Sequence, residues 1–178
     1  MTIATSRIFL IGPRGSGKTS LGTVLAHALG FSFVDTDDLV RAEAGLDVAG
    51  IVAAEGWDGF RRRESEALRA AARPRSVAAT GGGMVVDPAN RAFMQASGLV
   101  VYLRVPLEEL YRRLTADLKP GQRPSLTGKD PLEELAGVLA EREPLYREAA
   151  HIIVDAGRSL EEIADEVLTE VARQEGGA

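Results

Sequence analysis

Residues 12–19 carry the pattern that points most directly to chemistry, a glycine-rich segment that ends in lysine and threonine. They read GPRGSGKT, follow the apolar run at 8–11, and are followed by a helical pattern. A strand, this loop and a helix form the setting in which G-x-x-x-x-G-K-[ST] binds phosphate groups. The loop N–H groups and the helix dipole favour an anion, while Lys18 can reach the outer phosphates and Thr19 can bind Mg²⁺. A glycine-rich turn without a ligand is the alternative, but the complete pattern favours nucleotide binding.

Two aspartates follow the second apolar segment of the chain. Asp35 and Asp37 come directly after a strand pattern at 31–34. They should therefore lie at the carboxyl end of a strand, where ligands bind in open α/β sheets. Because side chains alternate in an extended segment, we expect the two carboxylates to point to opposite sides, one toward a metal ion and one toward a substrate. The alternative is that an aspartate here caps the helix that follows.

Three glycines and two arginines are the other chemically distinctive positions. Gly81, Gly82 and Gly83 follow the third strand pattern, where the backbone has to approach a neighbour closely. Arg61 and Arg142 lie in helical patterns. Each would ordinarily be a surface arginine whose ion pairs contribute under about 1 kcal/mol. Spacing alone does not assign either arginine to a site.

Short apolar strands alternate with helical patterns, which predicts one α/β domain over 1–178 with a five-stranded parallel sheet and helices on both faces. The predicted strands are 7–11, 31–34, 76–79, 99–103 and 152–154. The predicted helices are 18–29, 38–44, 48–55, 58–73, 88–96, 106–114, 132–148 and 159–174. The polar stretch at 115–131 is broken by Gly and Pro, which predicts a lid or a disordered loop.

Composition narrows the class of protein. The 178 residues, 45% of them hydrophobic, are enough for one buried core. A net charge of −5 and no long run of Lys or Arg argue against a nucleic-acid partner. The absence of cysteine excludes disulfides, thiolate zinc sites and a cysteine nucleophile. No apolar run reaches the ~20 residues of a membrane span, and no signal-peptide pattern opens the chain. We therefore expect a cytoplasmic monomer that acts on a small substrate, with no membrane partner.

Six segments together resemble the shikimate kinases, small kinases of aromatic biosynthesis, and look most similar to the shikimate kinase II type. They are the loop at 12–19, D-x-D at 35–37, G-W-x-x-F-R-x-x-E at 56–64, T-G-G-G at 80–83, R-P at 123–124 and E-R-x-P-L-Y at 141–146. All six occur in the order typical of the family and span nearly the whole chain. The resemblance implies a P-loop NTPase fold with a mobile lid. It also implies transfer of the γ-phosphoryl group of ATP to the 3-hydroxyl of shikimate, with Mg²⁺ as cofactor.

The resemblance implies roles for individual residues. Lys18 would stabilise the transferring phosphoryl group, Asp37 would bind the acceptor hydroxyls as general base, and Arg123 would close over the phosphates. Thr19 and Asp35 would hold Mg²⁺, and Asp35 would replace the acidic residue that the third strand lacks. The expected ATP-binding residues are Arg14, Gly15, Ser16, Gly17, Lys18, Thr19, Arg113, Arg123 and Arg158. The expected shikimate-binding residues are Asp37, Arg61, Gly81, Gly82, Gly83 and Arg142. Among these, Arg113 and Arg158 are the candidates for adenine, although Arg113 could equally be a surface residue of its helix.

Two other interpretations share the phosphate loop. A gluconate kinase or an adenylate kinase relative would have the same fold and Lys18. However, nothing in the sequence resembles a second nucleotide site, and a gluconate acceptor would not explain Asp37, Arg61 and Arg142 together. A binding module without turnover would be expected to have lost Lys18, Asp37 or Arg123, and all three are present.

Overall fold

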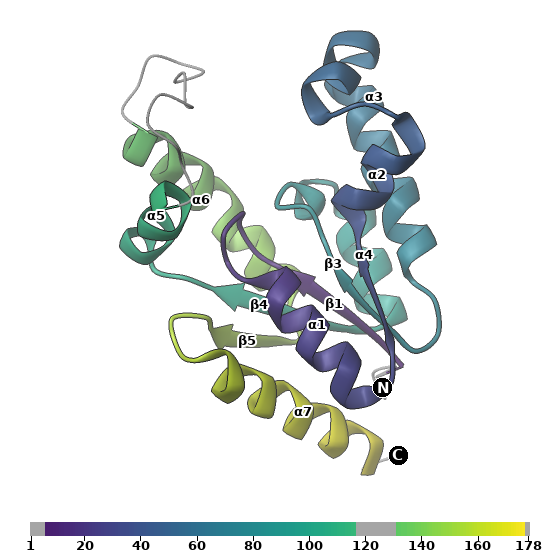
Figure 1. Ribbon diagram of the computed structural model, residues 1–178, viewed down its shortest axis with the longest axis vertical. Coiled ribbons are helices and arrows are strands. Elements are labelled where there is room, and N and C mark those ends of the chain that lie inside the picture. The colour runs from purple at the N-terminus through teal and green to yellow at the C-terminus, as the bar shows by residue number, and fades with distance from the viewer. Residues whose placement is uncertain (1–5, 117–130, 177–178) are drawn as a thin grey trace.

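Five parallel strands form the centre of the computed structural model, which describes residues 6–116 and 131–176. The strands are β1 (Arg7–Ile11), β2 (Ser32–Asp35), β3 (Ser76–Ala79), β4 (Leu99–Arg104) and β5 (Ile152–Asp155). They pair in the order β2-β3-β1-β4-β5, and every pair is parallel. The strand that leads into the phosphate loop is therefore the central strand of the sheet (Figure 1).

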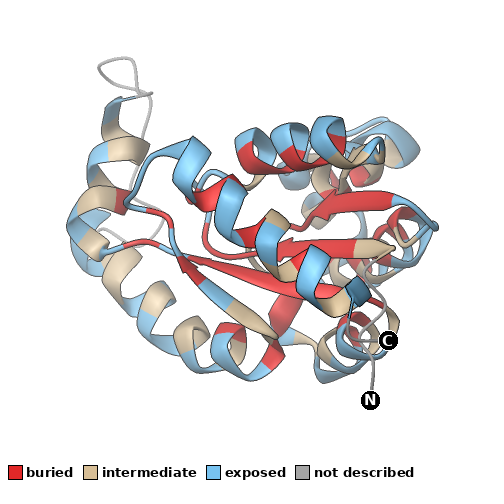
Figure 2. Ribbon diagram, turned by 90° about the horizontal axis from the view of Figure 1, so that it is seen from below, coloured by how far each residue is buried: buried red, intermediate tan, exposed pale blue. Residues whose placement is uncertain are grey.

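Helices cover both faces of this sheet, as the alternation of segments predicts. They are α1 (Lys18–Leu29), α2 (Thr36–Ala44), α3 (Val48–Ala71), the 3₁₀ helix η1 (Met84–Val86), α4 (Pro88–Ser97), α5 (Leu107–Ala116), α6 (Pro131–Ala149) and α7 (Leu160–Gly176). Apolar side chains of α1, α5 and α7 share one core cluster, and those of α3, α4 and α6 share another. Figure 2 shows the three inner strands β1, β3 and β4 mostly buried, whereas the edge strands β2 and β5 are partly exposed and the helices keep exposed outer faces.

Side-chain alternation along the central strands separates these two cores. Ile8 and Leu10 of β1 belong to the cluster with α1 and α7, whereas Phe9 and Ile11 belong to the cluster with α4 and α6. All four are essentially fully buried. A strand that is covered on both faces needs a continuous apolar run, which is why 8–11 contains no polar residue.

The predicted elements agree with the observed ones apart from a few boundaries. Helix α2 begins at Thr36 rather than 38, which changes the geometry of the aspartate pair. The expected break between the helices at 48–55 and 58–73 is present inside α3, where Gly56 has φ 73° and ψ 177°. The predicted capping box is confirmed, because the Glu162 N–H donates to Ser159 Oγ at 3.3 Å and the Ser159 N–H donates to Glu162 Oε2 at 3.0 Å.

The predicted lid at 115–131 lies mostly outside the described residues, which stop at 116 and resume at 131. No helix within 6–116 or 131–176 combines the length and the apolar character that crossing a membrane requires.

Candidate active site

The phosphate loop connects the end of β1 with the start of α1. Its glycines Gly12, Gly15 and Gly17 have φ of 145°, 81° and 95°, values that side-chain-bearing residues rarely adopt. Gly17 is also the N-cap of α1, and no side chain accepts a hydrogen bond there. The first N–H groups of α1 therefore remain directed at the loop, in the arrangement that binds phosphate.

Lys18 folds back over this loop. Its Nζ donates to the carbonyl oxygens of Gly12 at 2.8 Å and Pro13 at 2.7 Å, and to Ser16 Oγ at 3.3 Å. Burial lowers the pKa of Lys18 to about 8, while the negative charges of Asp37 and Asp35 raise it in opposition. The ammonium is therefore held between the loop and the two carboxylates.

The expectation that Asp35 and Asp37 point to opposite sides of a strand is wrong. Asp35 ends β2 and is the N-cap of α2, so its Oδ1 accepts a hydrogen bond from the Asp37 N–H at 2.9 Å. Its Oδ2 accepts a hydrogen bond from Thr19 Oγ1 at 3.3 Å. Because Asp37 already lies in the first helical turn, the alternation of an extended chain no longer applies, and both carboxylates line the same cavity.

Asp37 is a cavity-lining carboxylate whose pKa is raised by its surroundings. Burial raises its pKa, the neighbouring charge of Asp35 raises it further, and Lys18 and Arg41 lower it. A carboxylate with a raised pKa is a stronger base than an exposed aspartate. Asp37 thus combines access to the cavity with a proton affinity suited to general base chemistry.

Glu64 is a site residue to which sequence reasoning gave no role. It is 3% exposed and forms an ion pair with Arg61. Burial raises the pKa of Glu64, and the hydrogen bond from Arg61 lowers it. The spacing of the two residues, three apart on one helix, could have indicated this pair. The Arg61 guanidinium also lies 5.8 Å from the Trp57 ring and 5.6 Å from the Phe60 ring, so several neighbours hold its position.

The three glycines after β3 leave space for these charged side chains. A Cβ added at Gly81 would lie 2.6 Å from Asp37 Oδ1, and one at Gly83 would overlap the Arg61 guanidinium. The Gly81 N–H donates to Thr36 Oγ1 at 3.0 Å. This N–H is therefore engaged inside the protein. Gly81 serves the site by giving room to Asp37.

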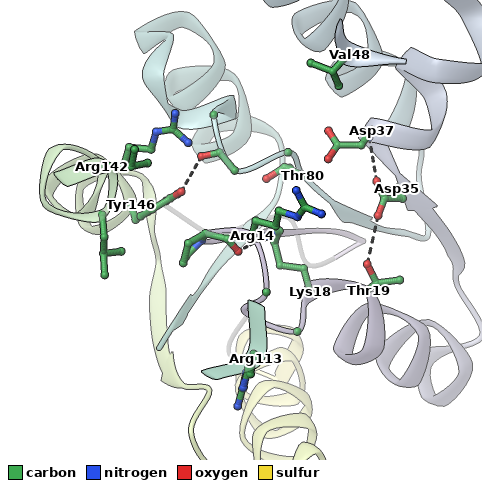
Figure 3. A pocket seen from close by; sticks show the side chains of 18 of the residues that line it. Arg14, Lys18, Thr19, Asp35, Asp37, Val48, Thr80, Arg113, Arg142 and Tyr146 are labelled. Carbon is green, nitrogen blue, oxygen red and sulfur yellow. Dashed lines mark hydrogen bonds between the residues drawn. The ribbon is translucent and has the colours of Figure 1, made fainter. Parts of the chain in front are cut away.

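Arg142 and Tyr146 reach the cavity from α6. In the view of Figure 3 they lie across from Asp35 and Asp37, with Lys18 between the two groups. The Tyr146 hydroxyl donates to the Gly82 carbonyl oxygen at 2.7 Å. The E-R-x-P-L-Y segment thus contributes two residues to the cavity, of which sequence reasoning had identified only the arginine.

The candidate nucleotide arginines differ in their surroundings. Arg113 lines the cavity, donates to the Ala156 carbonyl at 2.7 Å and forms an ion pair with Glu109. Arg158 forms an ion pair with Glu166 and does not line the cavity. Arg123 lies outside the described residues. Of the candidates for adenine, the structure therefore brings Arg113 to the cavity.

These elements surround a single cavity of about 1020 Å³. One end is formed by the phosphate loop and Arg113, and the other by Asp37, the glycine turn, Arg61 and Arg142. The residues that line it are Pro13, Arg14, Gly15, Gly17, Lys18, Thr19, Ser20, Asp35, Asp37, Arg41, Val48, Phe60, Arg61, Glu64, Thr80, Gly81, Gly82, Gly83, Arg112, Arg113, Ala116, Leu135, Val138, Leu139, Arg142 and Tyr146. The phosphate loop can bind the phosphates of a nucleotide, the arginines can bind an anionic group of a second ligand, and Asp37 lies near both. This arrangement can support phosphoryl transfer to a small molecule that carries both a hydroxyl and an anionic group.

Residues 14–172 match the family model described as shikimate kinase. The chain belongs to the shikimate kinase family. Shikimate kinases are ATP-dependent transferases, and the match covers every described element of the site except the start of the phosphate loop. The fold expected from the sequence, a P-loop kinase with a five-stranded parallel sheet, is confirmed.

Individual proteins to which the chain is similar support the same family. "Shikimate kinase 2" of Dickeya chrysanthemi is 57% identical over 152 residues, which cover 85% of this chain and 88% of the relative. The solved shikimate kinase of Acinetobacter baumannii, in complex with shikimate, has a TM-score of 0.85 at 36% identity and covers 95% of this chain and 94% of that one. A gluconokinase of Sinorhizobium meliloti has a TM-score of 0.59 at 18% identity, covers 97% of this chain and 93% of that one, and shares the fold alone.

Proposed function

We propose that this chain transfers the γ-phosphoryl group of ATP to the 3-hydroxyl of shikimate, which yields shikimate 3-phosphate and ADP. One observation carries the proposal. The cavity that the phosphate loop lines is also lined by Arg61, Arg142 and the basic carboxylate of Asp37. Shikimate has a ring with one carboxylate and three hydroxyls, so it offers an anion to the arginines and a nucleophile to the carboxylate.

The nucleotide end of the site would be formed by the loop and its neighbours. The backbone N–H groups of Gly15, Ser16 and Gly17 would bind the phosphates, and Lys18 would neutralise charge on the transferring group. Arg14 would lie along the phosphates and Arg113 beside the base. Arg123 would approach from the segment between α5 and α6. Arg158, the other expected nucleotide-binding arginine, forms an ion pair with Glu166.

The donor groups near Thr19 fit Mg²⁺. Thr19 Oγ1 and Asp35 Oδ2 lie 3.3 Å apart, so one hydroxyl and one carboxylate converge at the mouth of the loop. Mg²⁺ in kinases is held by few protein ligands and completes its coordination with water and substrate phosphates. Thr19 and Asp35 would therefore hold the ion together with ATP. When bound, Mg²⁺ would offset negative charge on the phosphate oxygens.

The acceptor end would orient shikimate for attack. Arg61 and Arg142 would bind its carboxylate, because a guanidinium matches that anion with two hydrogen bonds. Asp37 would accept the proton of the 3-hydroxyl. The oxygen then forms a bond to the γ-phosphorus while the bond from that phosphorus to the β-bridging oxygen breaks, and ADP leaves with the electron pair. Gly82 and Gly83 would border the acceptor with backbone groups.

A coupled assay of ADP release tests the proposed reaction. The protein is incubated with Mg²⁺ and ATP, together with shikimate, with gluconate or with no acceptor. We expect ADP release that depends on shikimate. Release with gluconate instead would keep the fold and change the acceptor. Release with neither, despite ATP binding, would favour a binding module without turnover.

We also propose that the chain acts as a single kinase domain over 1–178 and as a cytoplasmic monomer without nucleic-acid or membrane partners. The single five-stranded sheet supports one domain, and the net charge of −5 argues against a nucleic-acid partner. Light scattering at several protein concentrations would test the oligomeric state, since a monomer has a mass near 19.0 kDa at every concentration.

A further inference from the structure

Tyr146 is a buried side chain that borders the acceptor end of the cavity. It is 1% exposed and stacks on Tyr102 of β4, with ring centroids 5.0 Å apart and an interplanar angle of 19°. The stack belongs to the core cluster between the sheet and α4 and α6. The ring of Tyr146 is therefore fixed by packing, and the residue also lines the cavity.

That hydroxyl fixes the glycine turn. It donates to the Gly82 carbonyl oxygen at 2.7 Å, a short and unstrained hydrogen bond (Figure 3). The peptide between Gly82 and Gly83 is planar and trans, so its N–H points opposite to its carbonyl. Holding the Gly82 carbonyl therefore also fixes the direction of the Gly83 N–H. The turn itself is closed by the Met84 N–H, which donates to the Gly81 carbonyl oxygen at 3.0 Å. Glycines have no side chain that could also hold the peptide in the middle of the turn, so Tyr146 adds a contact that the glycines cannot supply.

The same tyrosine lies one helical turn after Arg142. Residues four apart share a face of a helix, so Arg142 and Tyr146 both face the cavity. Pro144 lies between them and lacks the N–H that would bond to the carbonyl four residues earlier. This turn of α6 has lost one internal hydrogen bond, so an anchor to the rest of the protein has more effect here than in a regular helix.

The hydroxyl remains a donor at any pH at which the protein would work. Burial raises the pKa of Tyr146 to about 12, although Arg142 lowers it in opposition. Arg142 acts on the pKa of Tyr146 both through its charge and through a side-chain hydrogen bond.

We propose that Tyr146 is a positioning residue, which sets the spacing between Arg142 and the Gly82–Gly83 peptide so that both meet the acceptor without rearrangement. This inference rests on the proposed function, because it assumes that these two groups bind shikimate. Preorganised groups bind more tightly than groups that must first be ordered. Tyr146 itself need not touch the substrate.

The buried stack offers a matched pair of variants. Tyr146→Phe removes the hydrogen bond to Gly82 and keeps the ring. Tyr102→Phe makes the same chemical change in the same stack, but its hydroxyl donates to Glu143, which is not among the cavity-lining residues. We expect Tyr146→Phe to raise the KM for shikimate by about 5- to 20-fold, with kcat and the KM for ATP within about 2-fold of wild type. Tyr102→Phe should lower the melting temperature by about as much as Tyr146→Phe does. It should leave the KM for shikimate near the wild-type value.

Two further measurements separate positioning from general loss of stability. Incorporating 4-aminophenylalanine at 146 restores an N–H donor at the same place, and we expect the KM for shikimate to return toward the wild-type value. In an Arg142→Ala background, Tyr146→Phe should raise the KM by less than it does alone, because one of the groups it positions is gone.

The outcomes distinguish this inference from the proposed function. If wild-type protein shows no ADP release with shikimate, the proposed function fails. If wild type turns over shikimate but Tyr146→Phe has an unchanged KM, or Tyr102→Phe raises the KM equally, the positioning role is wrong and the function stands.

Discussion

Replacing Gly81 with alanine would place a methyl group against the carboxylate of Asp37. The new Cβ would lie 2.6 Å from Asp37 Oδ1 and 3.1 Å from Glu64 Oε1, and the backbone φ of Gly81 is not positive. Ordinary contact between such atoms begins near 3.4 Å, so the Asp37 oxygen has to retreat by about 0.8 Å. The perturbation is thus steric and directed at one functional group.

The expected cost follows from that displacement. A misplacement of about 1 Å in a reacting group can cost about 10²-fold in rate, so Gly81→Ala should lower kcat by about 30- to 100-fold. The three atoms nearest to the new Cβ belong to Asp37 and Glu64, not to the phosphate loop. The KM for ATP should therefore stay within about 2-fold of wild type.

The assay is coupled ADP release at saturating ATP and varied shikimate, with thermal melting of each protein beside it. Gly137→Ala is the matched control, because it makes the same change on α6 with no described atom within 4 Å of the added Cβ. A kcat for Gly81→Ala within about 3-fold of wild type, in a folded protein, would refute the reasoning. It would mean either that Asp37 moves without consequence or that it is not the base.

The remaining predictions concern single side chains. Asp37→Asn should lower kcat by about 10²- to 10⁴-fold with little change in the Kd for ATP measured by titration. Because the raised pKa of Asp37 means that activity is lost as pH falls through it, the acidic limb of the wild-type pH–rate profile should be absent from this variant; an identical limb would assign it to another group. Arg142→Ala should weaken shikimate binding by about 2–3 kcal/mol, read from the emission of Trp57, the one tryptophan; unchanged affinity would mean that Arg142 does not bind shikimate. Gly98→Ala should destabilise the protein by about 1–3 kcal/mol, since its Cβ would meet a β1 carbonyl at 2.5 Å. Gly137→Ala should instead stabilise the protein by about 0.5–1 kcal/mol. Melting temperatures equal to that of wild type would contradict both expectations.

The elements and the phosphate loop were predictable because their signals are local. The apolar run at 8–11, the glycine at 30 and the Ser159–Glu162 pair each specify a strand, a helix end or a helix start within a few residues. The family resemblance extended this to about half of the cavity-lining residues, since the motifs within the described residues lie far apart in the sequence but meet at one edge of the sheet.

What sequence reasoning missed depends on contacts between distant segments. The orientation of Asp37 changed because α2 starts two residues earlier than its pattern suggested, which a boundary signal cannot resolve. The engagement of the Gly81 N–H depends on Thr36, 45 residues away. The link from Tyr146 to Gly82 spans 64 residues. Neither partner carries a local signal, because a hydroxyl on a helix pattern does not indicate what it will meet.

The contacts of Lys18 bear on how its variants should be interpreted. Its ammonium already has the carbonyls of Gly12 and Pro13 as partners, so a bound phosphate has to compete with two hydrogen bonds of the loop itself. Removing the lysine would leave both carbonyl oxygens without this donor, and an unmet buried acceptor is costly. A Lys18→Met protein would therefore lose the internal brace of the loop along with a charge for ATP. Inactivity of such a protein would measure the two losses together, and only a comparison of its unliganded melting temperature with that of wild type would separate them.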